Sequence, residues 1–342
     1  MKVIAIGDPH FHTDNIPEIE MFIDKLEQLC KQENPDLIVI LGDVLHTHER
    51  LHTIPLNKAY NFVDRMRKIS ETVILVGNHD MTSNQNFLNS HHWMNGMKEW
   101  KNITIADKVI YKEIKNIKLV FSPYVPPGKF EQALNTLNED WKSVDCIFAH
   151  QEFFGCKMGA IISIEGDKWD EKYPNIVSGH IHDKQTPQKN IYYCGASMQR
   201  AFGENENTVI PILTWKEKEK KKNYKLEEVE LGLPKKKIVY TDIDKIDTIK
   251  IPDSLDKIKI TLSGEYDEFK SFKKTKKYKD LIQSGTKVVF KPKKRKKEKE
   301  EKEEKEEKED SNFGTILFNL VSEEKNPFLL QTYEFVVNNK DF

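Results

Sequence analysis

Five short clusters of polar residues between residues 7 and 182 contain side chains that could bind metal ions. The clusters have the sequences GDPH, GDVLH, GNHD, AH and GHIH, and their candidate residues are Asp8, His10, Asp43, His46, Asn78, His79, His150, His180 and His182. A mixed set of carboxylate oxygens and imidazole nitrogens suits Mn²⁺, Fe²⁺ or Zn²⁺, whereas Ca²⁺ prefers oxygen alone and structural zinc sites use thiolates. The pattern therefore predicts a metal centre.

Each cluster ends an apolar run that predicts a buried strand. The runs are rich in β-branched residues and lie at 3–8, 36–43, 72–80, 145–152 and 175–183. Apolar residues at helical spacing between the first three runs predict two helices, with Pro17 and Pro55 near their first turns. This alternation favours a layered α/β domain, and such domains bind ligands at the carboxyl ends of their strands.

Residues 183–342 contain no histidine, and their apolar residues follow a different pattern. Apolar patterning there predicts strands at 209–215, 224–231, 257–264 and 286–292 and a Lys-rich helix at 265–285. We therefore expect a first domain at 1–233, a small α+β capping domain at 234–292, a charged low-complexity linker at 293–311 and a helical partner-docking segment at 312–342. Packing of this last segment onto the chain's own second domain is an equally good alternative.

Charge and hydrophobicity limit the possible partners and the cellular location of the protein. The 54 Lys and Arg residues nearly balance the 55 Asp and Glu residues, so a nucleic acid would need a local basic surface. The basic run at 291–297 is either such a patch or, as we favour, a solubilising segment. No apolar run approaches the roughly 20 residues of a membrane helix, and Lys2 is the only early positive charge, so we expect a soluble, intracellular protein without a secretion signal.

The order of the five clusters resembles the calcineurin-like metallophosphoesterase superfamily, whose motifs are DxH, GDxxD/H, GNHD/E, a lone His and GHxH. The resemblance covers residues 1 to about 200. It implies a four-layer α/β/β/α sandwich and two divalent metal ions, with Mn²⁺ favoured and Fe, Zn or Mg as alternatives.

Carried over residue by residue, the resemblance implies a role for each cluster. One metal would be held by Asp8, His10, Asp43 and His182, and the second by Asp43, Asn78, His150 and His180. Asp43 would bridge the two ions, which together would activate water for attack on phosphorus. His79 would donate a proton to the leaving oxygen, His46 would assist, and Asp80 would orient the His79 imidazole.

Longer stretches around the motifs resemble one branch of the superfamily. GNHDM, HQEFFGCKMG, SGHIHDKQ and IYYCGAS are most similar to SbcD-type DNA repair nuclease subunits, especially the T-even phage recombination endonuclease subunit and its viral relatives. This similarity implies a Mn²⁺-dependent DNA exonuclease and endonuclease. It also implies a homodimer and an SMC-like ATPase partner that would bind residues 312–336.

Several polar residues outside the motifs are weaker candidates. His12, His52 and Arg200 could contact the phosphates of DNA, although surface histidines and an ordinary ion pair are the plainer interpretations. Lys273 and Lys277 could do so from the Lys-rich helix, whose plainer interpretation is a solvated face. Residues 91–93 are expected to flank a helix, and the scattered cysteines are expected only to pack.

Two other functions compete with the nuclease. A phosphatase or small-molecule phosphodiesterase could use the same dinuclear site, and the Lys-rich helix is the feature that favours DNA over these substrates. A non-catalytic scaffold is the third alternative. The complete ligand set and the intact His79 argue against it.

Overall fold

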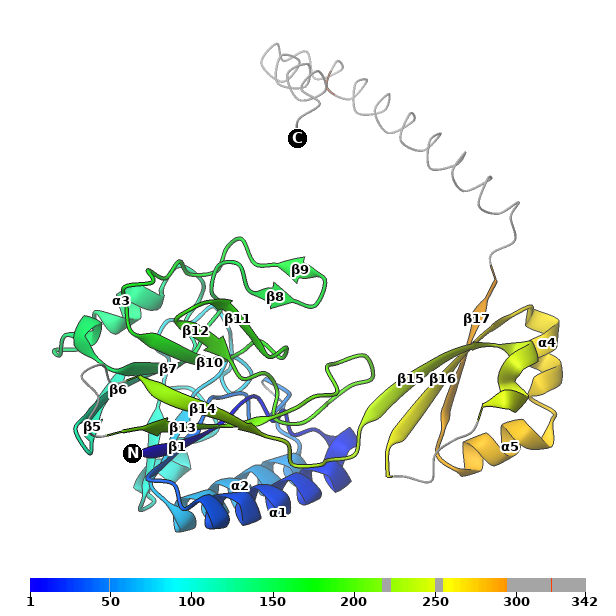
Figure 1. Ribbon diagram of the computed structural model, residues 1–342, viewed down its shortest axis with the longest axis horizontal. Coiled ribbons are helices and arrows are strands. Elements are labelled where there is room, and N and C mark those ends of the chain that lie inside the picture. Colours follow the sequence, from blue (N-terminus) through cyan, green and yellow to red (C-terminus); the bar gives the residue numbers. More distant parts are fainter. Residues whose placement is uncertain (49, 217–222, 250–254, 294–320, 322–342) are drawn as a thin grey trace. The chain divides into compact units, whose positions relative to one another are not determined.

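The computed structural model describes residues 1–48, 50–216, 223–249, 255–293 and 321. The chain forms two compact units (Figure 1), the first made of residues 1–238 and 251–259 and the second of residues 239–250 and 260–342. The expected linker and docking segment lie outside the described residues, apart from Lys293 and Val321.

The first unit contains two six-stranded sheets, each with a parallel centre. The first sheet has the order β14-β13-β1-β2-β3-β4 and its strands are β1 (Lys2–Ile6), β2 (Leu37–Ile40), β3 (Thr72–Leu75), β4 (Ile103–Ala106), β13 (Ile210–Trp215) and β14 (Tyr224–Val229). Strands β1 to β4 are parallel, and β13 and β14 form the expected antiparallel hairpin beside β1.

The second sheet is built in the same way from later segments. It has the order β11-β12-β10-β7-β6-β5, with β5 (Ile110–Ile114), β6 (Ile117–Ser122), β7 (Cys146–His150), β10 (Asn175–Gly179), β11 (Gln185–Gln188) and β12 (Ile191–Tyr193). Strands β6, β7, β10 and β12 are parallel, whereas β5 and β11 pair antiparallel at the two edges. The five strands predicted from the motifs are therefore divided between the sheets.

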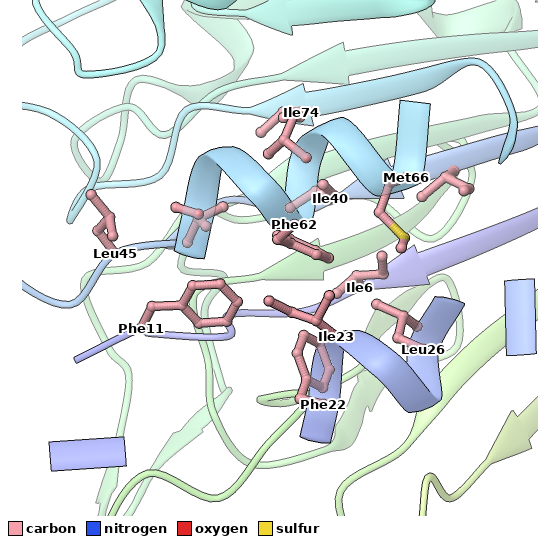
Figure 2. Close-up of a cluster of buried hydrophobic side chains, with 14 of the residues drawn as sticks. Ile6, Phe11, Phe22, Ile23, Leu26, Ile40, Leu45, Phe62, Met66 and Ile74 are labelled. Carbon is pink, nitrogen blue, oxygen red and sulfur yellow. The ribbon is translucent and has the colours of Figure 1, made fainter. Parts of the chain in front are cut away.

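Two long helices cover the outer face of the first sheet. They are α1 (Ile16–Glu33) and α2 (Thr53–Ile69), at the predicted positions. Pro17 lies in the first turn of α1, where a missing N–H costs no hydrogen bond, and Asn34 ends the helix in the left-handed conformation at φ 46°. Figure 2 shows Phe22, Ile23 and Phe62 from these helices packed over Ile6 and Ile40 of the sheet.

Alternation along the strands separates three cores. In β1, Ile4 and Ile6 contact the helices, whereas Val3 and Ala5 belong to the core between the two sheets. The outer face of the second sheet is covered by α3 (Phe130–Leu134), by the 3-10 helix η3 (Trp141–Ser143) and by the loop around Trp169. The four-layer α/β/β/α arrangement is thus confirmed, although its fourth layer consists mainly of 3-10 turns and loops.

Two smaller features complete the first unit. A short hairpin joins β8 (Lys157–Met158) to β9 (Ile161–Ile162). The remaining turns are the 3-10 helices η1 (Thr13–Asn15) and η2 (Asn95–Glu99). All four cysteines are buried with free thiols, as expected for packing residues, and they are Cys30, Cys146, Cys156 and Cys194.

The described residues between 236 and 293, most of which belong to the second unit, form a three-stranded sheet and three short helical segments. Its strands, in the order β15-β16-β17, are β15 (Lys236–Asp242), β16 (Lys257–Gly264) and β17 (Lys287–Pro292). The single helix expected at 265–285 is wrong, because Thr275 interrupts it: the Thr275 hydroxyl accepts a hydrogen bond from the Tyr278 amide and starts a new helix. The helices are η4 (Ile243–Thr248), α4 (Tyr266–Phe272) and α5 (Lys276–Gln283).

None of the described helices combines the length and the apolar character that a bilayer-spanning segment requires.

Candidate metal centre

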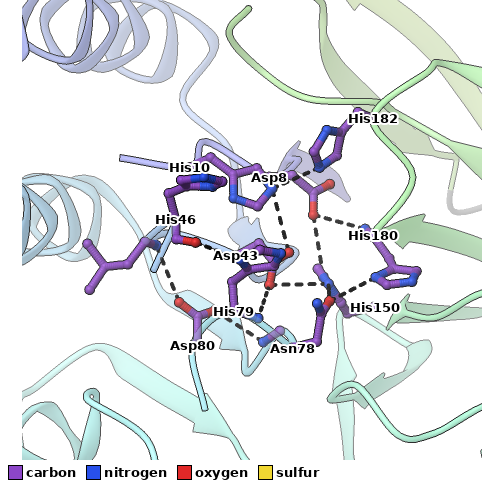
Figure 3. Close-up of polar contacts among 12 residues, drawn as sticks. Asp8, His10, Asp43, His46, Asn78, His79, Asp80, His150, His180 and His182 are labelled. Carbon is purple, nitrogen blue, oxygen red and sulfur yellow. Dashed lines mark hydrogen bonds and ion pairs between the residues drawn. The ribbon is translucent and has the colours of Figure 1, made fainter. Parts of the chain in front are cut away.

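The carboxyl ends of five strands bring the predicted ligands together (Figure 3). The loops after β1, β2 and β3 carry Asp8 and His10, Asp43, and Asn78, while β7 and β10 of the other sheet deliver His150, His180 and His182. Parallel strands end at the same edge of their sheet, so two stacked parallel sheets can place residues from distant parts of the chain in one cluster. The fold therefore explains how five separated motifs form one site.

The backbone of the cluster is strained at four of these residues. Asp8, His10, Asp43 and His180 adopt the left-handed region, with φ of 28°, 45°, 49° and 77°. Such a conformation costs a non-glycine residue about 1–3 kcal/mol and persists only where its surroundings enforce it. Here the His10 amide donates to the Asp43 carbonyl at 3.0 Å, and the His180 amide donates to the Asp8 carboxylate at 2.9 Å.

Glycines in two of the motifs allow the loops to approach one another closely. A β-carbon on Gly77 would collide with a carboxylate oxygen of Asp43. On Gly42, at φ 103°, it would lie 2.7 Å from Nδ1 of His150. No larger residue fits either position without moving a predicted ligand.

The predicted ligands make contacts with both oxygens of Asp43, and Nδ1 of His150 also lies 3.5 Å from Oδ1 of Asp8. In a first group of these contacts, Nε2 of His10 lies 2.8 Å from Nε2 of His182 and 3.6 Å from Oδ2 of Asp43. Asp8, His10 and Asp43 each offer a ligand atom within 4.8 Å of the others.

The second group meets the other oxygen of Asp43. Oδ1 of Asn78 lies 3.0 Å from Nε2 of His150 and 2.8 Å from Nδ1 of His180. Nε2 of His150 lies 3.4 Å from Oδ1 of Asp43. The two oxygens of Asp43 thus face the two groups, which is the arrangement a bridging carboxylate needs.

Unpartnered buried atoms show that the cluster fits metal ions. Oδ2 of Asp8 and Nδ1 of His10 are buried without a hydrogen-bond partner in the described protein. Burial of a carboxylate oxygen without a partner is costly, and a cation supplies the missing interaction. The oxygen and nitrogen donors match Mn²⁺, Fe²⁺ or Zn²⁺.

The acid-base state of the cluster also suits metal binding. Burial lowers the pKa of His10 well below its usual value and that of His180 to about 3, so both imidazoles keep a free lone pair at neutral pH. Burial raises the pKa of Asp8 to about 7. For His150, burial favours the neutral ring, but the carboxylates of Asp43 and Asp8 outweigh it and raise the pKa to about 9. A bound cation would favour the ionised carboxylates and the neutral ring.

His79 lies beside these contacts, and its ring offers a nitrogen within 4.8 Å of nitrogens of His10 and His46. Its backbone amide donates to Oδ1 of Asp43 at 2.8 Å, and Nδ1 lies 2.6 Å from the His46 carbonyl. His48 stacks on the His79 ring at a centroid distance of 4.3 Å. With Nδ1–H donating to the carbonyl, Nε2 is the nitrogen available for proton transfer.

The Asp80 carboxylate binds backbone amides and an indole, and it makes no hydrogen bond with the His79 ring. The carboxylate accepts hydrogen bonds from the amides of Val44 at 3.2 Å and Gly77 at 3.1 Å and from the Trp93 indole at 2.8 Å. The expectation that Asp80 orients the His79 imidazole is therefore wrong, because the His46 carbonyl holds that ring. Asp80 instead ties together the loops that carry Asp43 and Asn78.

Two aromatic residues next to the site were missed by sequence reasoning. Trp93 was expected to flank a helix, yet its indole N–H is a partner of Asp80. The ring of Tyr124 lies 5.3 Å from that of His180, between centroids, although no motif contains it. Both residues come from segments without a metal-binding pattern, so only the fold identifies them.

The weaker candidates of the first unit lie at the rim of the cluster. Nη1 of Arg200 lies 2.8 Å from Nε2 of His46, and the Arg200 side chain also pairs with Glu204 at 3.3 Å. Burial and the nearby Arg200 guanidinium lower the pKa of His46 to about 4. His12 makes an edge-to-face contact with His46 at 5.2 Å, and His52 lies 6.3 Å from His12.

The two lysine candidates belong to the second unit. Nζ of Lys273 lies 5.0 Å from the centre of the Phe269 ring. Lys277 donates to the Ile249 carbonyl at 3.4 Å.

Comparison with known proteins shows which family the first unit belongs to. Residues 1–184 match the model of the calcineurin-like phosphoesterase family. The chain is 50% identical to the provisionally named phosphoesterase 244L of invertebrate iridescent virus 6, over 80% of this chain and 98% of that protein. It is 45% identical to the provisionally named phosphoesterase 078R of invertebrate iridescent virus 3, over 86% and 85% of the two chains.

Solved structures resemble the chain only distantly. The phosphoesterase YfcE of E. coli has a TM-score of 0.30 and 14% identity, over 68% of this chain and all of that one. GAP50 of Plasmodium, an anchor in the inner membrane complex, has a TM-score of 0.40 and 15% identity, over 68% and 85% of the chains. At these scores neither structure supports an argument about this protein.

Proposed function

The chain belongs to the calcineurin-like phosphoesterase family, and from this premise we propose that it is a Mn²⁺-dependent phosphodiesterase that cleaves DNA. Members of this family generally bind two divalent metal ions and hydrolyse phosphate esters. The proposal further makes the chain the nuclease subunit of a recombination and repair complex with an SMC-like ATPase.

The observation that carries the proposal is the position of the Asp43 carboxylate. One of its oxygens lies near His10 and the other lies near His150. When bound there, two divalent ions would polarise the phosphate and generate hydroxide near neutral pH. Asp8, His10 and His182 would hold one ion together with Asp43, and Asn78, His150 and His180 would hold the other.

The protein's own contribution to the reaction is orientation and proton transfer. The His46 carbonyl accepts the Nδ1–H of His79, so the ring delivers a proton to the leaving oxygen from Nε2 when it is doubly protonated. Burial lowers the pKa of His79 and so favours the neutral ring, whereas the negative charge of a bound phosphodiester would favour the protonated ring. Asp80 and Trp93 keep the loops of Asp43 and Asn78 in place while this happens.

The second unit supports DNA as the substrate. Helices α4 and α5 and their junction expose five lysines that make no ion pair with a described acidic side chain, and these are Lys270, Lys273, Lys274, Lys276 and Lys279. Lys277 lies half-buried among them. Unpaired ammonium groups can replace the counterions of a phosphate backbone, which is the main source of affinity for DNA.

The proposed partners have their own test. We propose a homodimer and an ATPase partner docked on residues 312–336, which lie outside the described residues except for Val321. Light scattering of the purified chain should give twice the monomer mass of 40.1 kDa. A monomer would contradict the dimer.

The central experiment compares substrates that share phosphate chemistry and differ in size. Purified protein with Mn²⁺ is given end-labelled duplex DNA, circular single-stranded DNA, a chromogenic phosphodiester and a chromogenic phosphomonoester. Both DNA substrates and the diester should be hydrolysed, and all three activities should fall sharply in His79→Ala and further in Asp43→Ala.

The matched control is Glu139→Gln, which changes an exposed carboxylate away from the cluster and should keep wild-type rates. Hydrolysis of the monoester alone, with the DNA intact, would replace the nuclease by a phosphatase. DNA cleavage that survives in Asp43→Ala would show that a contaminant is responsible.

A further inference from the structure

The hairpin of β8 and β9 exposes apolar side chains close to the metal centre. Met158 is 37% exposed, Ile161 is 66% exposed and Ile164, just after the hairpin, is 77% exposed. Met158 and Ile161 are opposite each other in the ladder, so their side chains share one face of the hairpin. Neighbouring apolar side chains in water indicate a surface that another molecule covers.

The root of this hairpin is firmly held, so the exposure is a fixed property of the surface. The Ser163 amide donates to the Cys156 carbonyl at 2.8 Å, closing the base of the hairpin. The Lys157 amide donates to the Gln185 side chain at 2.7 Å, and the same side chain donates back to the Lys157 carbonyl at 2.8 Å. Cys156 and Ser163 are themselves buried.

Strand β8, the turn after it and the metal centre border an open cavity of about 290 Å³. Its lining combines the hairpin with the last predicted metal-binding motif, and the residues are Lys157, Met158, Gly159, His180, Ile181, His182 and Asp183. Small-ligand pockets measure roughly 300–1,000 Å³, so this cavity suits a single small group rather than a large one. Met158 and Ile181 give it apolar walls, and a phosphate at the two histidines would lie at its edge.

A second cavity, of about 520 Å³, is lined by His48, which stacks on His79, and by Asp80 and Trp93. It shares no lining residue with the cavity beside the hairpin. In Figure 3, Asp80 and His180 lie apart, with Asp43 drawn between them. A phosphodiester has two ester groups, and the two cavities could each take one of them.

We propose that the cavity under the β8–β9 hairpin is a nucleoside subsite, with Met158 packed against the base. This inference rests on the proposed phosphodiesterase activity and specifies which half of the substrate each side binds. Water adds to phosphorus, the P–O bond on the His79 side breaks, and the departing oxygen takes a proton. The nucleoside monophosphate stays under the hairpin until it is released.

Two diesters with the same leaving group test the subsite. One is the p-nitrophenyl ester of thymidine 5′-phosphate and the other is methyl p-nitrophenyl phosphate, so only the retained group differs. Met158→Ser should raise the KM for the thymidine ester about tenfold, as expected for the loss of one apolar contact. It should leave kcat/KM for the methyl ester unchanged, and Met158→Leu should restore the wild-type KM.

The control is Ile164→Ser, which removes an exposed apolar side chain that does not line the cavity. Its KM for both esters should equal that of the wild type. A second measurement uses product binding: Met158→Ser should weaken the affinity for thymidine 5′-monophosphate about tenfold in the presence of Mn²⁺.

The outcomes separate the subsite from the proposed function. If Met158→Ser slows both esters equally, or neither, the subsite is wrong while the phosphodiesterase stands, and the exposed hairpin would instead be a surface for a protein partner. If the wild type hydrolyses neither ester, the proposed function is wrong and the subsite is lost with it.

Discussion

The strand ends of the first unit and the helices of the second unit use charged residues in opposite ways. At the strand ends, Asp8 and Asp43 are almost fully buried, and burial raises the pKa of Asp8 to about 7. On α4 and α5, by contrast, charged groups such as Lys273 and Lys276 are exposed. A buried charge needs a specific partner, whereas an exposed charge is already satisfied by water.

This difference has a functional meaning. The buried cluster can hold ions in one geometry and perform chemistry, and a single substitution there should be severe. The exposed lysines can only contribute a diffuse attraction that salt screens, so single substitutions should be mild. The backbone agrees: four cluster residues are left-handed, whereas among the described residues of 255–293 only Gly285 has a positive φ.

The largest effect is expected for Asp43→Ala, which removes the carboxylate that contacts both donor groups. We expect metal analysis to find that the variant retains less than one ion per chain. Activity should fall at least about a thousandfold, because the lost stabilisation amounts to several kcal/mol of barrier. A variant that still binds two ions would show that Asp43 does not bridge them.

His79→Ala should separate metal binding from proton transfer. Because the His79 side chain is not a predicted ligand, the variant should bind two ions as the wild type does. Its kcat should fall about a hundredfold, the lower end of what a general acid contributes. Loss of metal in this variant would instead make His79 a ligand.

Trp93→Phe tests whether the support beneath the cluster matters. It removes the indole N–H that donates to Asp80 while keeping an aromatic ring. We expect about a tenfold loss of kcat and about 1 kcal/mol of unfolding free energy, measured by steady-state kinetics and urea unfolding. Trp100→Phe is the matched control, since the Trp100 ring contacts Arg67 instead.

The smallest effects are expected on the lysine surface. Lys273→Gln combined with Lys277→Gln should weaken DNA binding a few-fold and reduce the slope of log affinity against log salt by about two, one for each lysine. The kcat for a chromogenic diester should not change. Lys189→Gln, an exposed lysine of the first unit, serves as the control. Equal weakening by the control would mean that the attraction to DNA is not localised on α4 and α5.

The sequence predicts much of the first unit because its motifs combine two signals in one segment. In DLIVILGD, for example, the apolar run specifies β2, and the polar end places Asp43 at the sheet edge. Spacing also locates α1, which begins at Ile16 with Pro17 in its first turn. Such local patterns do not depend on distant parts of the chain.

What the sequence does not predict depends on contacts between distant segments or on weak local signals. Asp80 follows His79 directly, yet the turn closed by its amide and the Gly77 carbonyl directs the carboxylate toward Trp93. Tyr124 reaches His180 only because β6 and β10, which lie on either side of β7, end at the same edge of the second sheet. Strand β15 has no clear apolar pattern because it is rich in Lys and only half-buried. The capping residue Thr275 lies within a long amphipathic pattern that, by itself, predicts one continuous helix.

Because all four cysteines are buried, the native protein has no thiol that reacts readily with reagents in solution. Because the thiolate is the reactive form, and burial raises the pKa of each thiol while hiding it from solvent, maleimide dyes should leave the native protein unlabelled. A single Ile161→Cys substitution would then create the one modifiable position, on the hairpin beside the cluster. A fluorophore attached there would report the arrival of a substrate directly, in a protein that otherwise keeps its native sequence.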